Sequence, residues 1–376
     1  SYWALDSALS RAMGSISPRF GRPHTKTKDD ILNLPTADKH EKALSANVIS
    51  PKDLGVTYDM IGGLQQVKES LRQCITYPLK YPRLYSEGVA QEAVKGVLLF
   101  GPPGTGKTML AKAVATEGGA TFLTVDASTI ENKWLGESEK NARAVFTLAR
   151  QLAPCVIYLD EVDSVLSSRE GGDDSSHGTL TSVKTTLMQE WDGLRTTKDR
   201  VVVIASTNRP FDLDEAVLRR LPRRILVDLP DLKTRAEVMA VTLKDNRLAP
   251  DVNLTAIAET LEGYSGSDIK EVCREAVVRV SHERAQLLEG VSLSEGATAT
   301  SDTRDVAIDT MLDGEEDFLR PVSARDFKMA AKKLKASVND NSRELQKVME
   351  WNEKYGEMKE TSKGRSRNQV SMSMYI

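Results

Sequence analysis

The sequence predicts an α/β fold, in which a five-stranded parallel sheet lies between two layers of helices and is followed by a small helical domain. Five short apolar runs alternate with helical patterns, and after Pro230 the strand-like runs stop and helical periodicity takes over. Continuously apolar strands separated by helices are typical of a parallel sheet that is covered on both faces. Such a sheet binds ligands at the carboxyl ends of its strands. The runs predicted as strands span 96–100, 121–125, 155–159, 201–205 and 225–229.

Changes in composition divide the chain into four segments. Residues 1–55 are predicted to form an arm or linker with a helix near 38–46, and residues 56–230 form the sheet domain. Residues 231–356 form the helical domain, and residues 357–376 form a flexible tail.

The helical domain carries an acidic insert at 286–320, rich in Ser, Thr and Gly, in which nine acidic residues accompany Arg304 and Arg320. We interpret this insert as a solvated loop in preference to an acidic docking site. Helix is expected to resume from Ser323 to about Tyr355.

The overall composition excludes several classes of protein. The chain has 376 residues, of which 28% are charged, and a formal net charge of -3, which excludes a chain disordered throughout, a collagen and a disulfide scaffold. The near-neutral balance gives no electrostatic argument for nucleic acid, so none is expected as a partner. No run approaches the roughly 20 apolar residues that cross a bilayer, so we expect membrane association only through a segment preceding Ser1. Three isolated cysteines indicate a reducing compartment and no catalytic thiol: Cys74, Cys155 and Cys273.

A glycine-rich loop directly follows the first predicted strand and precedes the helical run 109–115. It satisfies the pattern G-x-x-x-x-G-K-[ST] in the strand–loop–helix context that confirms a phosphate-binding loop. Its glycines let backbone N–H groups surround phosphate oxygens, Lys107 reaches the β- and γ-phosphates, and the Thr108 hydroxyl ligates Mg²⁺. The loop alone therefore predicts a bound nucleotide together with Mg²⁺ and does not say which nucleotide. The loop consists of Gly101, Pro102, Pro103, Gly104, Thr105, Gly106, Lys107 and Thr108.

The third predicted strand ends in the acidic pair Asp160-Glu161. Two acids at a strand end can be a simple polar stop, but a phosphate-binding loop about 50 residues earlier favours a catalytic pair. One carboxylate then lies beside Mg²⁺, Asp160 acting through a water molecule, and the other polarises the attacking water. Glu161 is the predicted general base, and its presence favours hydrolysis over simple nucleotide storage.

Two further polar groups follow the later strands. Asn208 comes after the fourth strand, where an amide can orient water or sense the γ-phosphate, although an Asx turn before Pro210 is the alternative. Four arginines then occupy the six positions from 219 to 224. They form either a solvated basic turn or an arginine finger that reaches a neighbouring subunit's γ-phosphate.

Taken together, these motifs resemble an AAA ATPase module of the P-loop NTPase class over about residues 55–356. The resemblance includes the runs at 61–64 and 263–269, and its motifs occur in the family's order. It implies that ATP and Mg²⁺ are the cofactors, that Asn208 is sensor 1, that Arg219 and Arg220 are fingers acting in trans, and that the chain forms ring hexamers. It also assigns adenine and intersubunit contacts. The adenine and nucleotide contacts are Met60, Ile61, Gly62, Met109, Gly266 and Ser267, and the intersubunit contacts are Asp192, Gly193 and Arg223.

The segment after the second strand resembles the first pore loop of AAA protein translocases. It contains Lys133, Trp134 and Leu135, although Leu135 stands where an aromatic residue is commoner. An aromatic side chain at this position can wedge between the side chains of an extended polypeptide substrate with little sequence preference. The Gly-rich stretch 169–178, with His177, is the expected second pore loop.

Within the family, the segments 126–138, 218–222 and 345–356 resemble the meiotic clade. That clade contains spastin, katanin, the ESCRT-disassembling ATPase and the mitochondrial outer-membrane protein-extracting ATPase, to which 77–79 and 109–113 add further similarity. The resemblance implies a hexameric translocase that extracts mislocalised or tail-anchored membrane proteins at the mitochondrial outer membrane, and also at the peroxisome, with its catalytic part facing the cytosol. A microtubule-severing ATPase and a nucleotide-switched assembly scaffold are the alternatives.

Overall fold

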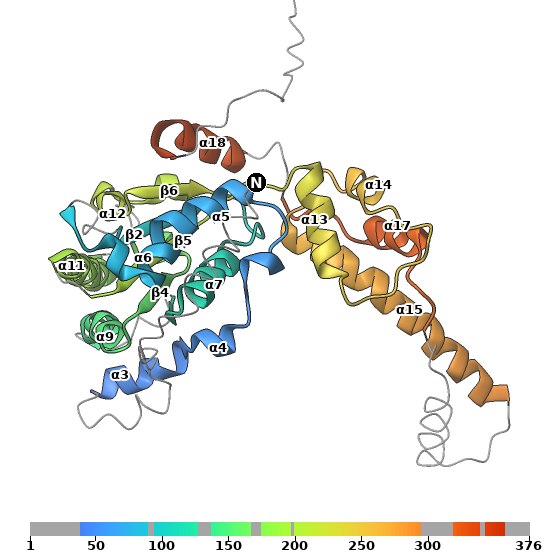
Figure 1. The fold of residues 1–376 in the computed structure, drawn as a ribbon, viewed down its shortest axis with the longest axis horizontal. Helices are drawn as coiled ribbons and strands as arrows, with labels where there is room; N and C mark the ends of the chain where they lie inside the picture. Colours follow the sequence, from blue (N-terminus) through green and yellow to red (C-terminus); the bar gives the residue numbers. More distant parts are fainter. Residues whose placement is uncertain are drawn as a thin grey trace, which may run out of the picture.

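Two lobes, a sheet domain and a helical lid, make up the part of the chain that the structure describes (Figure 1). In this computed structural model the described residues are 38–88, 94–126, 137–166, 174–196, 199–294, 319–338 and 343–357. Before the first long strand lie α3 (Lys39–Leu44), η1 (Ser45–Asn47), β1 (Val48–Ile49), α4 (Pro51–Leu54), η2 (Tyr58–Met60), α5 (Gln65–Leu71), the π-helical η3 (Arg72–Thr76), α6 (Tyr77–Lys80) and η4 (Pro82–Tyr85). The rest of the sheet domain contains β2 (Gly96–Phe100), α7 (Lys107–Gly118), β3 (Thr121–Val125), α9 (Glu137–Gln151), β4 (Cys155–Leu159), α10 (Val162–Leu166), α11 (Asp174–Thr196), β5 (Val201–Thr207), η6 (Pro210–Asp212), α12 (Glu215–Arg220) and β6 (Arg223–Leu226).

The sheet has six strands in the order β1-β3-β4-β5-β2-β6. All neighbouring pairs are parallel except β1 and β3, which run antiparallel with Val48 opposite Leu123. The five parallel strands that the sequence predicts are therefore present. The predicted total of five is wrong, because a short antiparallel strand is added at one edge. The sixth strand has only two residues, too few to produce a recognisable alternation in the sequence, and its pairing with the edge strand β3 defines it.

Alternate residues of the central strands pack into two separate cores. Leu98 and Phe100 face the side covered by α9, α11 and α12, whereas Val97 and Leu99 face the side covered by α5 and α7. This period of two is the ordinary geometry of a strand, and burial on both faces explains why the strands are apolar at nearly every position.

The last part of the predicted arm belongs structurally to the sheet domain. Asp38 caps α3 in a capping box with Glu41, and the Glu41 carboxylate accepts a hydrogen bond of 2.8 Å from Thr147 on α9. The buried Leu44 and Val48 join the core of that side of the sheet. The domain boundary predicted at residue 55 therefore lies C-terminal to a segment that already packs on the sheet.

The final strand begins two residues earlier than expected. The predicted strand covered 225–229, whereas β6 spans Arg223–Leu226 and pairs Arg223 with Val97. Apolar residues alone defined the prediction, and the two arginines at the start of β6 do not carry that signal.

The described residues of the lid form four helices around a core of their own: α13 (Leu232–Thr242), α14 (Leu254–Glu259), α15 (Gly266–Ser294) and α17 (Ala324–Lys333). The predicted solvated insert at 286–320 is wrong at its N-terminal end, because α15 continues to Ser294. Residues 295–318 lie outside the described part of the chain. The helix expected from 323 to 355 is instead two helices, α17 and α18 (Arg343–Tyr355).

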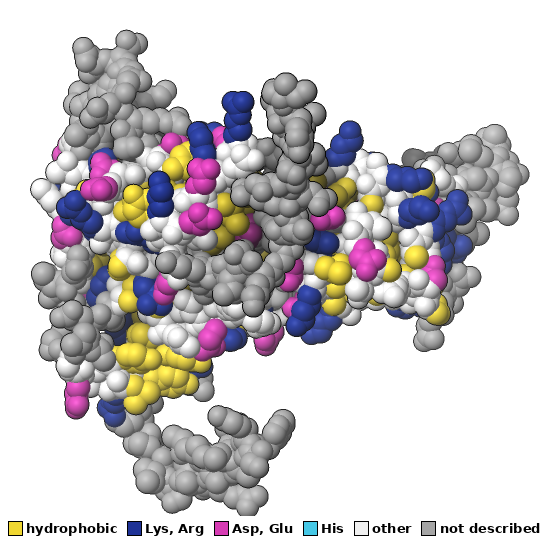
Figure 2. All heavy atoms as spheres, turned by 90° about the horizontal axis from the view of Figure 1, so that it is seen from above, with side chains coloured by type: hydrophobic (Ala, Val, Ile, Leu, Met, Phe, Trp, Pro, Cys, Tyr) yellow, Lys and Arg dark blue, Asp and Glu magenta, His cyan; other side chains and the backbone are white. Residues whose placement is uncertain are grey.

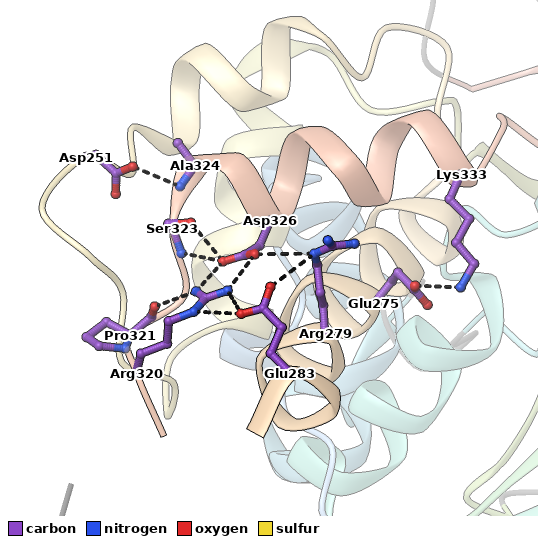
Figure 3. Close-up of polar contacts among 10 residues, drawn as sticks. All are labelled: Asp251, Glu275, Arg279, Glu283, Arg320, Pro321, Ser323, Ala324, Asp326 and Lys333. Carbon is purple, nitrogen blue, oxygen red and sulfur yellow. Dashed lines mark hydrogen bonds and ion pairs between the residues drawn. The ribbon is translucent and has the colours of Figure 1, made fainter. Parts of the chain in front are cut away.

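A cluster of ion pairs joins the C-terminal end of that insert to helix α15 of the lid (Figure 3). Arg320 donates to Asp326 at 2.7 Å and to Glu283 at 2.5 Å, and Arg279 lies 3.6 Å from Asp326. Burial alone would raise the pKa of Asp326, but the hydrogen bonds from Arg320 and Ser323 outweigh it and lower the pKa to about 2. The cluster joins α15 to the N-terminus of α17.

Helix α18 packs on the sheet domain and not on the lid, although it follows the lid in sequence (Figure 1). The Trp351 ring packs edge-on against the ring of Phe100 in β2, with the two ring centroids 4.8 Å apart, and Val348 joins the same core. The lid predicted at 231–356 therefore includes α18, whereas the structure packs this helix on the sheet domain. Within the described residues, no helix combines the length and the apolar character needed to span a membrane.

Candidate active site

The candidate site lies at the carboxyl edge of the sheet, where the loops after β2, β4 and β5 meet. These three strands are neighbours in the order β4-β5-β2 and run parallel, so Gly101, Asp160 and Asn208 all follow strand ends at the same edge. The three segments are far apart in the sequence, and the sheet topology brings them together. Figure 2 shows a face of the molecule on which Lys and Arg side chains alternate with Asp and Glu, in keeping with the near-neutral net charge.

The loop after β2 has a backbone that requires glycine. Gly101 has φ +142 and a Cβ there would lie 2.2 Å from the carbonyl oxygen of Val227, while Gly104 has φ +74 and faces Ser265 of the lid. Both the left-handed backbone and the lack of space exclude larger residues. The loop leads directly into α7, whose first residue is Lys107.

The Lys107 ammonium is held inside this loop. It is buried and donates hydrogen bonds to the carbonyl oxygens of Gly101 at 3.0 Å and Pro102 at 2.6 Å. Burial lowers its pKa to about 8, and the nearby Asp160 carboxylate offsets part of that effect. A phosphate group at the N-terminus of α7 would stabilise the charged form further.

Four side chains form a hydrogen-bonded network below the loop. The Tyr158 hydroxyl lies 2.9 Å from that of Thr108, 3.0 Å from that of Ser206 and 3.1 Å from a carboxylate oxygen of Asp160. Ser206 also donates to Asp160 at 2.5 Å. The sequence-based prediction missed Tyr158 and Ser206. The available signal was alternation, since Tyr158 is two residues before Asp160 in the same extended segment and so lies on the same side.

Glu161 takes a backbone conformation that is uncommon for a residue with a side chain, with φ +47. Its N–H donates to the Asp160 carboxylate at 3.1 Å, and its carbonyl accepts from Ser164 as α10 begins. This turn exposes the Glu161 side chain at the edge of the site. Left-handed backbone at a non-glycine residue is often found where function demands a side chain in an unfavourable place.

The end of β5 is anchored on both sides of Asn208. Thr207 donates to Asp163 at 2.6 Å and accepts from the N–H of Arg209 at 2.8 Å. The buried amide oxygen of Asn208 has no hydrogen-bond partner among the described residues. Arg209 reaches Glu344 of α18, so the turn that carries Asn208 also contacts the C-terminal helix.

The arginines after α12 differ in their environments. The Arg219 side chain is 77% exposed and pairs at 3.1 Å with Glu215 of the same helix. Arg220 is only 18% exposed and contacts both the carboxylate of Asp192 and, at 2.8 Å, the carbonyl of Ala216. The structure thus brings together Arg220 and Asp192, two residues predicted to serve intersubunit contacts, and Gly193 lies next to them on α11.

The other predicted finger candidates turn towards their own chain. Arg223 pairs with Glu357 just beyond α18, and Arg224 donates to the carbonyl of Leu218 at 2.8 Å. Both side chains therefore help to fasten the end of α18 and the turn after α12.

The predicted adenine contacts lie where the sheet domain meets the lid. Gly62 packs against α13, because a Cβ there would approach the backbone nitrogen of Val238 to 2.5 Å. The N–H of Ser267, at the start of α15 beside Gly266, donates to the Gly104 carbonyl at 3.0 Å. Ile61 is buried, while Met60 and Met109 expose their side chains.

The predicted pore residues are placed only in part. Lys133, Trp134 and Leu135 lie outside the described residues. The backbone of His177 lies in the first turns of α11, which begins at Asp174, so the C-terminal part of the predicted second pore loop is helical and not a loop.

The donors at this edge fit a magnesium–nucleotide complex. The Thr108 hydroxyl and Asp160 carboxylate are hard oxygen ligands, which Mg²⁺ prefers, and they lie on either side of Tyr158. Within the described residues no group of three or more His, Cys, Asp or Glu side chains gathers to hold a metal by itself. This agrees with the general behaviour of Mg²⁺, which is usually bound through one or two protein groups together with phosphate oxygens.

The chain is similar to known ATPases in sequence and in structure. Residues 97–229 match the family described as "ATPase family associated with various cellular activities (AAA)", and residues 251–295 match the "AAA+ lid domain". The outer mitochondrial transmembrane helix translocase of Homo sapiens is 37% identical over 300 residues, which are 80% of this chain and 76% of that protein. An A-like 1 form of the katanin p60 ATPase-containing subunit, from Oryctolagus cuniculus, is 38% identical over 321 residues, 84% of this chain and 61% of that protein.

Two further comparisons extend this similarity. The cell division cycle protein 48 homolog of Archaeoglobus fulgidus is 50% identical over 223 residues, which are 59% of this chain but only 30% of that protein. The crystal structure of the FIGL-1 AAA domain superposes with a TM-score of 0.66 at 33% identity and covers 86% of this chain and 97% of that one.

Proposed function

Because the chain belongs to the AAA family of ATPases, we propose that it hydrolyses MgATP in a ring of six copies and uses the energy to thread polypeptide through a central pore. The observation that carries the proposal is the convergence of the loop after β2, the Asp160-Glu161 pair and Asn208 at one edge of the sheet. Relatives named for helix translocation and for katanin are 37% and 38% identical to this chain, which supports the proposal.

Each residue at that edge has a distinct task in hydrolysis. Lys107 and the N–H groups at the start of α7 would hold the phosphates, while Thr108 directly and Asp160 through water would hold Mg²⁺, whose charge would offset that of the phosphates. Glu161 accepts the proton of the attacking water, and the Asn208 amide orients that water or the γ-phosphate. Glu161 combines this uncommon backbone with an exposed side chain, whereas the side chains that restrain Asp160 are those of Tyr158 and Ser206.

The site needs a second copy to be complete. Arg219 is the favoured finger because its side chain is exposed and its pairing partner Glu215 is also exposed, so little free energy opposes its transfer to a neighbour's phosphate. Arg220, held by Asp192, supports the same interface from within its own chain. An arginine that acts on the next copy requires a head-to-tail interface, and such an interface forms a ring when the rotation between copies closes.

Trp134 and its neighbours Lys133 and Leu135 are the proposed grip on the substrate. Extraction of mislocalised or tail-anchored membrane proteins is the favoured activity, because the translocase relative is covered over three quarters of its length. This activity would place the chain at the mitochondrial outer membrane. Microtubule severing is the second candidate, favoured by the similarity to the katanin relative.

The test measures ATP turnover and movement of a model polypeptide in parallel. Purified protein should hydrolyse MgATP well above a Glu161→Gln control, and a Trp134→Ala variant should keep its basal turnover while losing movement of a fluorescent tail-anchored substrate. Rings that bind ATP without turnover above the Glu161→Gln control would contradict the motor and favour a nucleotide-switched scaffold. Stimulation by tubulin tails, without extraction, would favour the severing enzyme.

A further inference from the structure

The hydroxyl group of Tyr158 is the centre of a four-oxygen network at the proposed magnesium site. Its oxygen lies within 2.9 Å of Thr108, 3.0 Å of Ser206 and 3.1 Å of Asp160. Tyr158 has no exposed surface, and all three partners belong to the edge where nucleotide would bind. A single buried hydroxyl therefore connects one proposed magnesium ligand with the other.

Counting protons determines the direction of these hydrogen bonds. The three hydroxyl groups carry one proton each, and an ionised Asp160 can only accept. Ser206 uses its proton on Asp160, in the shortest contact of the network at 2.5 Å. The Tyr158 proton goes to Asp160 or is shared with Ser206, so the contact between Tyr158 and Thr108 needs the Thr108 proton. Thr108 is then the donor and Tyr158 the acceptor.

We propose that Tyr158 is a positioning residue that turns the Thr108 hydroxyl so that its proton points into the network and its lone pairs face the magnesium ion. The inference rests on the proposed function, since it concerns the same MgATP site. A hydroxyl without such an acceptor would rotate, and its proton would spend part of the time directed at the cation. When the hydroxyl is oriented before the cation binds, the free energy of turning it no longer opposes binding.

The position of the Tyr158 ring does not depend on its hydroxyl. The ring stacks on Phe122 with centroids 5.6 Å apart, and β4 pairs with β3 on one side and β5 on the other. Replacement by Phe should therefore remove the hydrogen bonds and leave the ring in place.

The experiment titrates Mg²⁺ against binding of a fluorescent ATP analogue, with Glu161→Gln in every variant so that hydrolysis does not interfere. Tyr158→Phe should raise the Mg²⁺ concentration at half-maximal binding by roughly three- to tenfold, as expected for the loss of one hydrogen bond. Binding of the analogue in EDTA should not change. Tyr58→Phe is the matched control, because Tyr58 is also buried and its hydroxyl lies 3.1 Å from that of Thr76, outside the hydrogen-bonded network of the proposed magnesium ligands.

A double-mutant cycle separates this role from a general structural one. In a Thr108→Ala background, Tyr158→Phe should shift the Mg²⁺ midpoint much less than in the parent, because the hydroxyl that it orients is gone and only its contact with Asp160 is left to lose. Three results would overturn the inference. They are the same Mg²⁺ midpoint for Tyr158→Phe and Tyr58→Phe, a loss of analogue binding in EDTA as large as the loss in Mg²⁺, and additive effects in the cycle. If the parent protein showed no Mg²⁺-dependent binding at all, the proposed function itself would fail, which is a distinguishable result.

Discussion

Two regions can be compared: the sheet edge that carries the phosphate-binding loop, and the arginines of α12. They differ in how far contacts within a single chain fix their geometry. At the edge, Lys107 is buried and the Thr108, Tyr158, Ser206 and Asp160 side chains are joined by direct hydrogen bonds. On α12, Arg219 extends into solvent with a single exposed partner of its own helix. The nucleotide-binding half of the proposed site is thus formed within one chain, whereas the proposed other half would come from a neighbouring copy.

Replacing the general base gives the largest expected effect on the half formed within one chain. Glu161→Gln should lower ATP turnover by up to about 10⁴-fold, because the attacking water loses its proton acceptor. Nucleotide affinity should stay the same, since the Glu161 side chain is exposed and belongs to none of the contacts that hold Lys107. Single-turnover assays and binding titrations measure the two quantities. Turnover close to that of the parent protein would remove Glu161 as the base.

Removing the exposed arginine is expected to lower turnover by about 10³-fold, and only in the assembled ring. Arg219→Ala should bind nucleotide like the parent protein, and Arg274→Ala, which removes another exposed arginine paired within its helix, should have no effect. Turnover measured across protein concentrations gives the comparison. Arg220→Ala should instead raise the concentration needed for assembly, because it frees Asp192.

Mixing two inactive variants tests whether Arg219 acts across the interface. Glu161→Gln and Arg219→Ala protein, each inactive alone, should recover turnover when co-assembled, because some interfaces then combine an intact Glu161 with an intact Arg219. If mixing restored nothing while mixed rings formed, the arginine would belong to the same chain as the base, and the division between the two halves would be wrong.

The smallest expected effect is a dependence of ATP affinity on pH that comes from Lys107 alone. Its pKa of about 8 means that the free chain loses this charge as the pH rises through 8, while bound phosphate favours the protonated form. ATP affinity should therefore fall by roughly eightfold between about pH 7.5 and 9, with proton uptake on binding. Calorimetry in buffers of different ionisation enthalpy measures both. Lys107→Arg should flatten the dependence, and equal affinity at both pH values without proton uptake would contradict the low pKa.

Strong local signals allowed much of the fold and the P-loop to be predicted. The apolar runs located β2, β3, β4 and most of β5, and the spacing from Gly101 to Thr108 predicted the loop that the structure places between β2 and α7. Contacts between distant segments were not predictable in this way. Strand β1 has two residues and exists through its pairing with β3, and α18 follows the lid in sequence but packs on Phe100.

The sequence by itself determined which residue types stand at the ends of the strands and therefore which chemistry the chain can perform. Periodicity and motif spacing are local properties, so they survive without a structure. Only the tertiary structure decided that Tyr158 connects Thr108 with Asp160, and that Arg219 is exposed while Arg220 is held by Asp192. Those distinctions depend on side chains from separate elements, whose distances are set by the packing of the sheet and its helices and not by their positions along the chain.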